Sequence, residues 1–223
     1  MNDVGESIFR YFLDNQLADK IVEDLLNDRI SSRECWEQLC KAAPALEKQV
    51  LDEFIMSQEI EPTLHSFVEF CGQHKFDLYV LSDGFDYYIN QILTREKLNY
   101  LKVFSNKLIL NEKGKLIPSF PFYNSDCKST ANCKRIHIIE NSGEEDYTVF
   151  IGDGNSDKDP IQYVDFIFAK KDLLKYCEVN RITYFPFSDF DDVIERLTEL
   201  GSRKRLKKRH QAELKRREAF LME

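Results

Sequence analysis

Residues 147–160, with the sequence YTVFIGDGNSDKDP, constrain the fold of this 223-residue chain more than any other stretch. The run from Tyr147 to Ile151 is apolar, aromatic and β-branched, which predicts a strand buried on both faces of a parallel sheet. A tight turn from Gly152 to Asp157 follows at once. Because α/β sheets bind ligands beyond the carboxyl ends of their strands, this turn is a candidate site.

The turn carries two carboxylates, Asp153 and Asp157, four residues apart. Oxygen ligands of this kind suit a hard cation such as Mg²⁺. The same residue types also make an ordinary turn from a strand to a helix, with an aspartate as the N-cap. Taken alone, the motif leaves both interpretations open.

The rest of the chain divides into a helical part, an alternating part and a charged tail. Residues 3–57 have helical periodicity throughout, and Ser31 with Glu34 predicts a capping box. Strands and helices then alternate, which predicts a parallel, doubly wound sheet. The expected strands are 77–81, 101–104, 147–151, 165–169 and 183–185, with a hairpin formed by 107–110 and 115–117. The expected later helices are 61–75, 87–95, 132–141, 171–177, 190–200 and 203–223.

These patterns predict three domains: a helical segment at 1–60, an α/β core at 61–200 and a basic helix at 201–223. No apolar run is long enough to span a membrane, and the N-terminus does not have the pattern of a signal peptide. We therefore expect a cytoplasmic protein. The six cysteines are expected to be reduced thiols, with Cys127 and Cys133 forming a loop pair and no metal site.

Charge is unevenly distributed along the chain. Residues 203–223 contain nine Lys or Arg and three Glu, a net charge of +6, so the other residues carry −14 of the total of −8. An acidic body does not favour nucleic acid as the main partner. The basic tail is expected to be a solvated helix face or a weak anion-binding arm, which would fit an acidic partner.

Two further sites complete the candidate chemistry. Ser82 ends a predicted strand, and Asp83 with Gly84 is expected to open the next helix, where a hydroxyl and free N–H groups bind phosphate well. Lys134 begins a later helix and can neutralise a phosphoryl oxygen. Each residue alone is more often a cap or a solvated charge, and it is their order and spacing that favours a site.

This order resembles the haloacid dehalogenase-like hydrolases, in the phosphoserine-phosphatase-like branch with a helical cap early in the chain. The second motif of that family matches LYVLSDG with Ser82, its third matches Lys134, and its fourth matches Gly152, Asp153 and Asp157. The resemblance covers nearly the whole chain. It implies a Rossmann-like doubly wound sheet, with residues 1–60 as the cap.

The resemblance also implies a Mg²⁺-dependent phosphatase that forms an aspartyl phosphate. Ser82, Asp83, Gly84 and Lys134 would bind the phosphate; Asp153 and Asp157 would serve the metal; Lys134 and Asp157 would be catalytic. Within the branch, the chain is most similar to methionine-salvage phosphatases that act on methylthio-pentenyl phosphates. Phosphoserine, phosphoethanolamine and phosphocholine phosphatases are close relatives, so the substrate is expected to be a small phosphorylated metabolite.

The first motif of the family, an apolar strand ending in Asp-x-Asp-x-Thr, has no match in residues 1–223. It would supply the nucleophile and the central first strand, which in the family lies between the strands of the second and fourth motifs. We therefore expect an N-terminally shortened, inactive chain in which residues 78–81 and 149–151 lack a shared neighbour. The alternative hypothesis is a catalytically dead protein that binds phosphate or acts as a scaffold.

Overall fold

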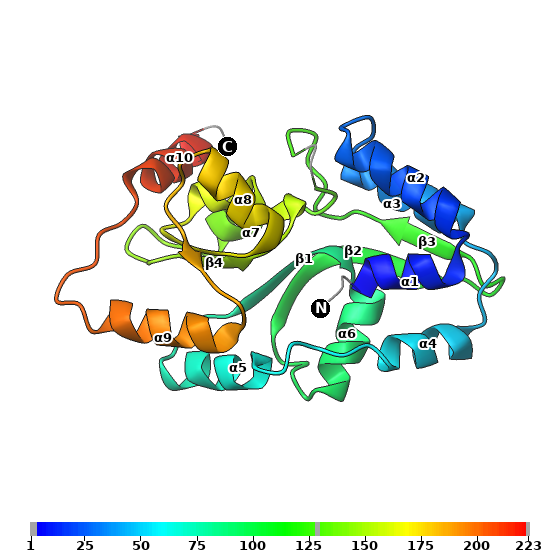
Figure 1. The fold of residues 1–223 in the computed structure, drawn as a ribbon, viewed down its shortest axis with the longest axis horizontal. Coiled ribbons are helices and arrows are strands. Elements are labelled where there is room, and N and C mark those ends of the chain that lie inside the picture. The colour runs from blue at the N-terminus through cyan, green and yellow to red at the C-terminus, as the bar shows by residue number, and fades with distance from the viewer. Residues whose placement is uncertain (1–3, 128–129, 222–223) are drawn as a thin grey trace. The chain divides into compact units, whose positions relative to one another are not determined.

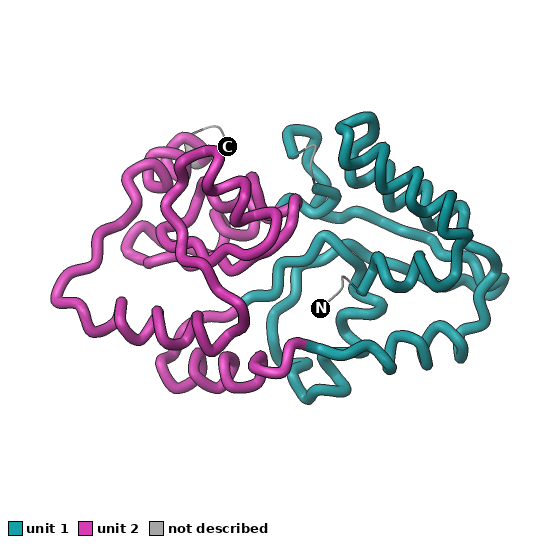
Figure 2. Tube along the Cα trace, viewed as in Figure 1, with its two compact units in different colours: residues 1–60, 79–133 teal, residues 61–78, 134–223 magenta. Residues whose placement is uncertain are grey.

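The structure is a computed structural model that describes residues 4–127 and 130–221. The chain forms two compact units, each made of two segments: 1–60 with 79–133, and 61–78 with 134–223. Figure 2 shows unit 1 in teal and unit 2 in magenta. The predicted functional division into a cap, a core and a tail stays a prediction.

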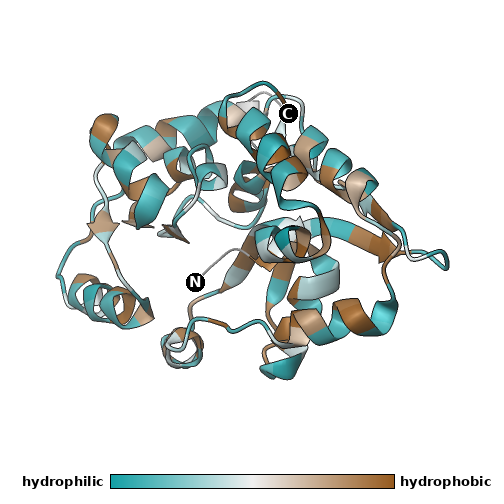
Figure 3. Ribbon diagram, turned by 45° about the vertical axis from the view of Figure 1, so that its right-hand side comes forward, coloured by the Kyte–Doolittle hydropathy of each residue, from teal (hydrophilic) through white to brown (hydrophobic). Residues whose placement is uncertain are grey.

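Unit 1 begins with helices, as the periodicity predicts. They are α1 (Val4–Phe12), α2 (Asn15–Leu26), α3 (Ser32–Ala42) and α4 (Lys48–Met56), shown in blue to cyan in Figure 1. The capping box before α3 is confirmed, because Glu34 N donates to Ser31 Oγ (3.2 Å) and Ser31 N donates to Glu34 Oε2 (2.8 Å). Hydrophobic and hydrophilic residues alternate along these helices (Figure 3), and the apolar ones form one core with α6 (Asp86–Arg95).

The sheet of unit 1 has the strand order β1 (Tyr79–Phe85), β2 (Lys102–Leu110), β3 (Leu116–Ser119). β1 pairs with β2 in parallel, and β2 forms an antiparallel hairpin with β3. The hairpin is confirmed, although the two predicted runs at 101–104 and 107–110 form one strand. Gly114 is required in its turn: φ is 71°, and a Cβ there would lie 2.5 Å from the carbonyl oxygen of Leu46.

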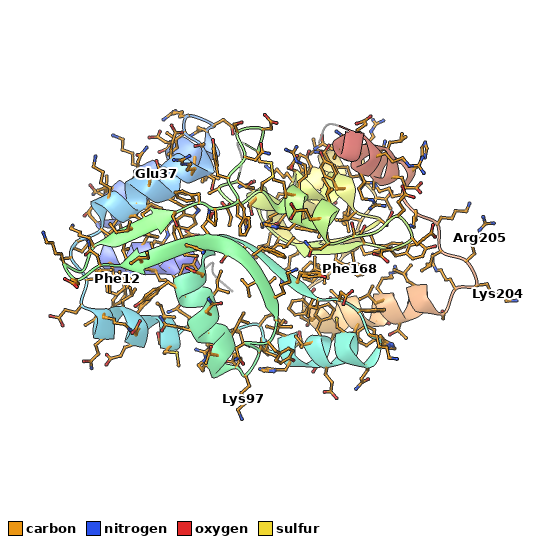
Figure 4. All side chains as sticks on the ribbon, turned by 180° about the vertical axis from the view of Figure 1, so that it is seen from behind. Phe12, Glu37, Lys97, Phe168, Lys204 and Arg205 are labelled. Carbon is orange, nitrogen blue, oxygen red and sulfur yellow. A yellow bond between two sulfur atoms is a disulfide. The ribbon has the colours of Figure 1, made fainter. Side chains whose placement is uncertain are left out.

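Unit 2 contains a second sheet, which is entirely parallel. Its strand order is β4 (Val149–Gly152), β5 (Phe166–Ala169), β6 (Phe185–Pro186). Its helices are α5 (Leu64–Gln73), α7 (Lys134–Glu140), α8 (Lys171–Val179), α9 (Phe190–Gly201) and α10 (His210–Leu221), with the short 3₁₀ turns η1 (Asn155–Asp157) and η2 (Pro160–Tyr163). Phe168, labelled in Figure 4, is fully buried, as is Leu173 of α8.

A mixed α/β fold with parallel strands is thus confirmed. Within the described residues, β1 and β4 are each the end strand of a three-stranded sheet. The prediction that the strand at 147–151 is buried on both faces is wrong in part. Phe150 is 7% exposed, but Val149 is 38% exposed. An end strand has a neighbour on one side only, and this leaves part of its surface uncovered.

The tail differs from the predicted continuous helix over 203–223. Residues 203–209 are not helical, and α10 begins at His210. Two bonds tie this segment to other parts of unit 2: Lys208 Nζ donates to the carbonyl oxygen of Glu144, and Arg209 N donates to Asp165 Oδ1 (3.0 Å). The labelled side chains of Lys204 and Arg205 point away from the ribbon in Figure 4.

The prediction of six reduced thiols is wrong for one pair. Cys127 and Cys133 form a disulfide, with their Cα atoms 5.9 Å apart. The spacing of the two cysteines in the sequence alone does not reveal this pairing. The free cysteines of the described part of the chain are all buried: Cys35, Cys40, Cys71 and Cys177. Across residues 4–127 and 130–221, no helix combines the length and apolar character that crossing a bilayer requires.

Candidate active site

A buried ion pair lies at the carboxyl end of β4. Lys134 Nζ, at the start of α7, donates to Asp157 Oδ1 (2.7 Å) and to Ser156 Oγ (2.9 Å). Only 6% of the lysine side chain and 8% of the aspartate side chain are exposed. Ion pairs so well shielded from water interact strongly, and they persist only when both groups have hydrogen-bond partners. The pair therefore holds the start of α7 against the loop after β4.

The second oxygen of Asp157 organises the loop itself. Asp157 Oδ2 accepts hydrogen bonds from the backbone N–H groups of Asp153 and Gly154, each at 3.0 Å. Gly152 makes this geometry possible, because a Cβ at that position would lie 2.5 Å from Asp157 Oδ2. Both carboxylate oxygens of Asp157 thus accept hydrogen bonds, Oδ1 from Lys134 and Oδ2 from two backbone amides.

Asp153 is placed quite differently. Its side chain is 45% exposed, and its Oδ2 atom accepts a hydrogen bond from the exposed Lys171 Nζ at 2.8 Å. The backbone carbonyl of Asp153 accepts from the N–H groups of Asp172 and Leu173 at the start of α8. The backbone is therefore fixed by α8 while the carboxylate stays accessible to a ligand.

These contacts bear on how the two aspartates could serve a metal ion. Within residues 4–127 and 130–221, no group of three or more His, Cys, Asp or Glu residues is arranged to hold one. Mg²⁺ nevertheless binds in many proteins through one or two carboxylates, several waters and a substrate phosphate. Asp153 fits such a site as a direct ligand. Asp157 would have to give up Lys134 or the two amides, so its contacts fit a supporting role.

The predicted phosphate-binding residues Ser82, Asp83 and Gly84 lie in unit 1. The expectation that Asp83 and Gly84 open a helix is wrong, because β1 continues to Phe85 and α6 begins at Asp86. The register of β1 against β2 shifts between Leu81 and Phe85, which marks an irregular strand. Gly84 N donates to Ser82 Oγ at 3.1 Å, so this N–H faces the serine hydroxyl.

Asp83 is the anchor of this segment. Its Oδ1 atom accepts from the N–H groups of Ala131 (2.7 Å) and Asn132 (2.8 Å), and its Oδ2 atom accepts from Ser32 Oγ on α3 (2.5 Å). These bonds hold Asp83 within unit 1 and connect β1 with the first helices and with the loop that precedes α7.

A partly buried acid, Asp159, lies just after the ion pair. Burial raises the pKa of Asp159, and the positive charges of Arg135 and Lys215 oppose that shift. Asp159 immediately precedes η2, two residues after Asp157. The loop after β4 therefore contains three carboxylates with three environments: Asp153 forms an exposed ion pair, Asp157 forms a buried one, and Asp159 is partly buried.

The chain is similar to known proteins, and this similarity shows its family. A model of the family described as "Putative Phosphatase" matches residues 15–181, more than half of the chain. The chain belongs to this phosphatase family. It is a phosphatase of the haloacid dehalogenase-like type and a phosphoric monoester hydrolase, close to the methionine-salvage phosphatases. The resemblance inferred from the motifs is confirmed.

Two curated relatives of the phosphatase carry the name 2-hydroxy-3-keto-5-methylthiopentenyl-1-phosphate phosphatase. The protein from Bacillus mycoides is 27% identical over 201 residues, which cover 89% of this chain and 91% of the relative. The protein from Bacillus cereus strain 03BB102 is 28% identical over 205 residues, with the same coverage of the two chains.

Solved structures support the fold of the phosphatase. A phosphoserine phosphatase captured as a phospho-aspartyl intermediate analogue matches with a TM-score of 0.64 and 20% identity, over 87% of this chain and 91% of that one. A probable phosphoserine phosphatase from Vibrio cholerae matches with a TM-score of 0.66 and 14% identity, over 92% and 63% of the two chains. At these identities the likeness concerns the fold alone.

Sequence reasoning missed several residues that build the site of the phosphatase. Asn132 is fully buried, and its Nδ2 atom donates to the carbonyl oxygens of Ser82 (2.7 Å) and Phe104 (2.9 Å), joining β1 to β2. Its position two residues before Lys134 was the available signal. Ser156 could have been noticed beside Asp157, whereas the contact between Ser32 and Asp83 spans 51 residues and has no local signal.

Proposed function

We propose that the protein hydrolyses a small phosphate monoester with the help of Mg²⁺ and through an aspartyl phosphate. The observation that carries the proposal is the buried pair of Lys134 and Asp157 at the carboxyl end of β4, next to the exposed carboxylate of Asp153. Such a pair keeps an ammonium group in place within a low-dielectric surrounding, where it stabilises phosphoryl charge far better than in water.

Each residue has a defined task in this proposal. Lys134 neutralises a phosphoryl oxygen. The assignment of Ser82, Asp83 and Gly84 to phosphate binding stays a prediction. Asp153 would hold Mg²⁺, which when bound would offset the negative charge of the phosphate. Asp157 keeps Lys134 and the loop in place. The aspartate of the aspartyl phosphate would be the one expected from the first motif of the family, to which residues 1–223 contain no match.

The substrate class comes from the relatives. The curated relatives named above act on 2-hydroxy-3-keto-5-methylthiopentenyl-1-phosphate, and the structural neighbours act on phosphoserine. We therefore propose a small phosphorylated metabolite, with the methylthiopentenyl phosphate as the first compound to test.

The test is phosphate release by the protein purified from its own cells, so that the molecule is measured as it exists there. We expect hydrolysis that requires Mg²⁺ and falls at least about 100-fold in Lys134→Met and Asp153→Asn. The control variant is Lys175→Met, because Lys175 pairs with Asp172 on the exposed surface of α8. Hydrolysis that persists in Lys134→Met would contradict the proposed site.

A second candidate function is phosphate binding without hydrolysis. It is favoured by one observation: both oxygens of Asp157 are occupied by Lys134 and by two backbone amides. In this case inorganic phosphate would raise the melting temperature by mass action, and no test ester would be turned over. Turnover of any ester that is lost in Asp153→Asn excludes this candidate.

A further inference from the structure

The C-terminal helix is docked on unit 2, although its composition is that of a solvated helix. α10 packs against η2, the short turn that follows the loop with Asp153 and Asp157. On the side of α10 that is covered, Ala212 is fully buried and Arg216 is only 6% exposed. A buried arginine in a basic tail calls for partners of its own.

Arg216 has these partners. Its Nη1 atom donates to the carbonyl oxygen of Tyr163 (2.7 Å) and to Thr148 Oγ1 (3.0 Å), and its guanidinium lies 3.4–3.5 Å from both carboxylate oxygens of Asp165. The side chain of Asp165 is 0% exposed. Asp165 also accepts from Thr148 N (3.1 Å) and Oγ1 (3.0 Å) and from Arg209 N (3.0 Å).

A second arginine closes the same turn. Arg209 Nη1 donates to the carbonyl oxygens of Ile161 (2.7 Å) and Val164 (3.4 Å). With the bond from Arg216 to Tyr163, three carbonyl groups at the end of η2 receive arginine donors. Carbonyl groups at the end of a helical turn have no partners within the turn, so cations placed there stabilise it.

η2 lies next to both parts of the candidate site. It begins at Pro160, three residues after Asp157, and it packs against α7, which starts with Lys134. Arg135 of α7 lies over the ring of Tyr163, 5.9 Å from its centroid. A displacement of η2 would therefore displace Asp157 through the residues that connect them, and Lys134 through the contact between η2 and α7.

We propose that α10 is a positioning element of the candidate active site and that Arg216 is its positioning residue. Arg216 fixes η2, and η2 holds the loop of Asp157 and the start of α7 at the spacing that the ion pair needs. The importance of this positioning for catalysis rests on the proposed function, whereas the contacts of Arg216 with η2 do not depend on it.

The experiment measures amide hydrogen exchange in the protein without substrate. The reporters are the N–H groups of Asp153 and Gly154, which are bonded to Asp157 Oδ2. We expect Arg216→Leu to accelerate their exchange by about tenfold or more, because the buried carboxylate of Asp165 loses its cation and η2 loses the donor to the Tyr163 carbonyl oxygen. The matched control is Arg217→Leu, which removes an exposed arginine from the adjacent position of α10.

An amide remote from α10 separates positioning from overall stability. Phe67 N donates to the carbonyl oxygen of Thr63 in α5, also within unit 2. If Arg216→Leu accelerates exchange at Phe67 as much as at Asp153, or if it matches Arg217→Leu, the proposal is overturned.

A conservative pair keeps the test decisive if Arg216→Leu does not fold. Arg216→Lys retains the charge beside Asp165 but cannot donate in several directions from a rigid fork, so we expect intermediate acceleration compared with Arg217→Lys. Equal exchange in these two variants would overturn the proposal. If the protein releases no phosphate but amide exchange at Asp153 and Gly154 depends on Arg216, only the proposed function is overturned. If the protein is active but Arg216→Leu leaves this exchange unchanged, only the positioning role is overturned.

Discussion

At the scale of single residues, the buried pair of Lys134 and Asp157 should dominate the energetics of the loop after β4. Lys134→Met leaves a buried carboxylate without its cation, which we expect to reduce the free energy of unfolding by about 3–5 kcal/mol. The control is Lys171→Met, which breaks the exposed pair with Asp153 and should cost less than about 1 kcal/mol. Urea unfolding followed by circular dichroism measures both, and equal losses would contradict the prediction.

Asp159 gives a pH dependence with a definite sign. Because burial raises its pKa in the folded state, its contribution to stability is complete below its ordinary pKa of 3.8 and is lost as the pH rises through the folded-state value. Asp159→Asn removes this dependence. We therefore expect the variant to gain stability relative to the parent protein as the pH rises from about 3 to about 7.

Urea unfolding at several pH values measures that difference in free energy. Asp126→Asn, at an exposed position, shows the effect of the substitution type alone. A difference between parent and Asp159→Asn that stays constant with pH, or that moves in favour of the parent as the pH rises, would disprove the assignment.

The sequence predicted a site residue only where its role depends on neighbouring positions in the chain. Asp153, Asp157 and Lys134 could be named in advance because a strand, a turn and a helix start place them in a recognisable order. The different tasks of the two aspartates could not be predicted, since they depend on which carboxylate meets Lys134 across 23 residues of chain. Burial decides this, and burial is a property of the folded unit.

At the scale of elements, the capping box before α3 offers a quantitative test. Ser31→Ala removes the acceptor for Glu34 N, and we expect a loss of about 1 kcal/mol. Glu47 is the N-cap of α4 and makes no side-chain capping bond, so Glu47→Ala should change stability very little. Thermal unfolding compares the two variants, and a larger effect of Glu47→Ala would refute the assignment.

Elements defined by short-range patterns were predicted well, and their boundaries were predicted less well. The helices of residues 3–57 and the hairpin around Gly114 depend on periodicity, caps and turn residues. The boundary between β1 and α6 depends instead on distant partners. Asn132 and Asn106 donate to the carbonyl oxygens of Ser82 and Asp83, and these bonds keep the segment extended where the local sequence suggests a helix start.

At the scale of the whole molecule, the buried thiols report on both units. Burial raises the pKa of Cys35 and Cys40 in unit 1 to about 12 and that of Cys71 in unit 2 to about 11, and it also raises the pKa of Cys177. For a thiol with a pKa of about 12, roughly one molecule in 10⁴ carries the reactive thiolate at pH 8. We expect negligible alkylation of these four cysteines in the native protein.

Mass spectrometry after a short exposure to iodoacetamide measures the labelling, with the same reaction in urea as the control for complete modification. Rapid modification of Cys35 and Cys40 alone would show that unit 1 opens under native conditions. Rapid modification of all four thiols would contradict the described burial.

The general architecture followed from the sequence, while the role of the tail did not. Alternating strands and helices predicted parallel α/β structure, and the family motifs predicted a phosphatase. The charge of residues 203–223 suggested an arm in solvent, yet Arg209 and Arg216 have their partners inside unit 2. A charge pattern predicts an exposed helix face only where the surroundings are water. Around the tail, the surroundings also include the carboxylate of Asp165 and several backbone carbonyl groups.

The close approach at Gly152 has a consequence for how the sequence can vary. Any side chain there collides with Asp157, so among viable variants in a saturation library only glycine should survive at this position. Gly72 and Gly201 have open space where a Cβ would stand. Alanine at these two helical positions should be enriched, since it favours helices by about 0.5–1 kcal/mol over glycine. The three glycines thus differ in what they tolerate. Gly152 has no permitted substitute, whereas Gly72 and Gly201 can be replaced by alanine.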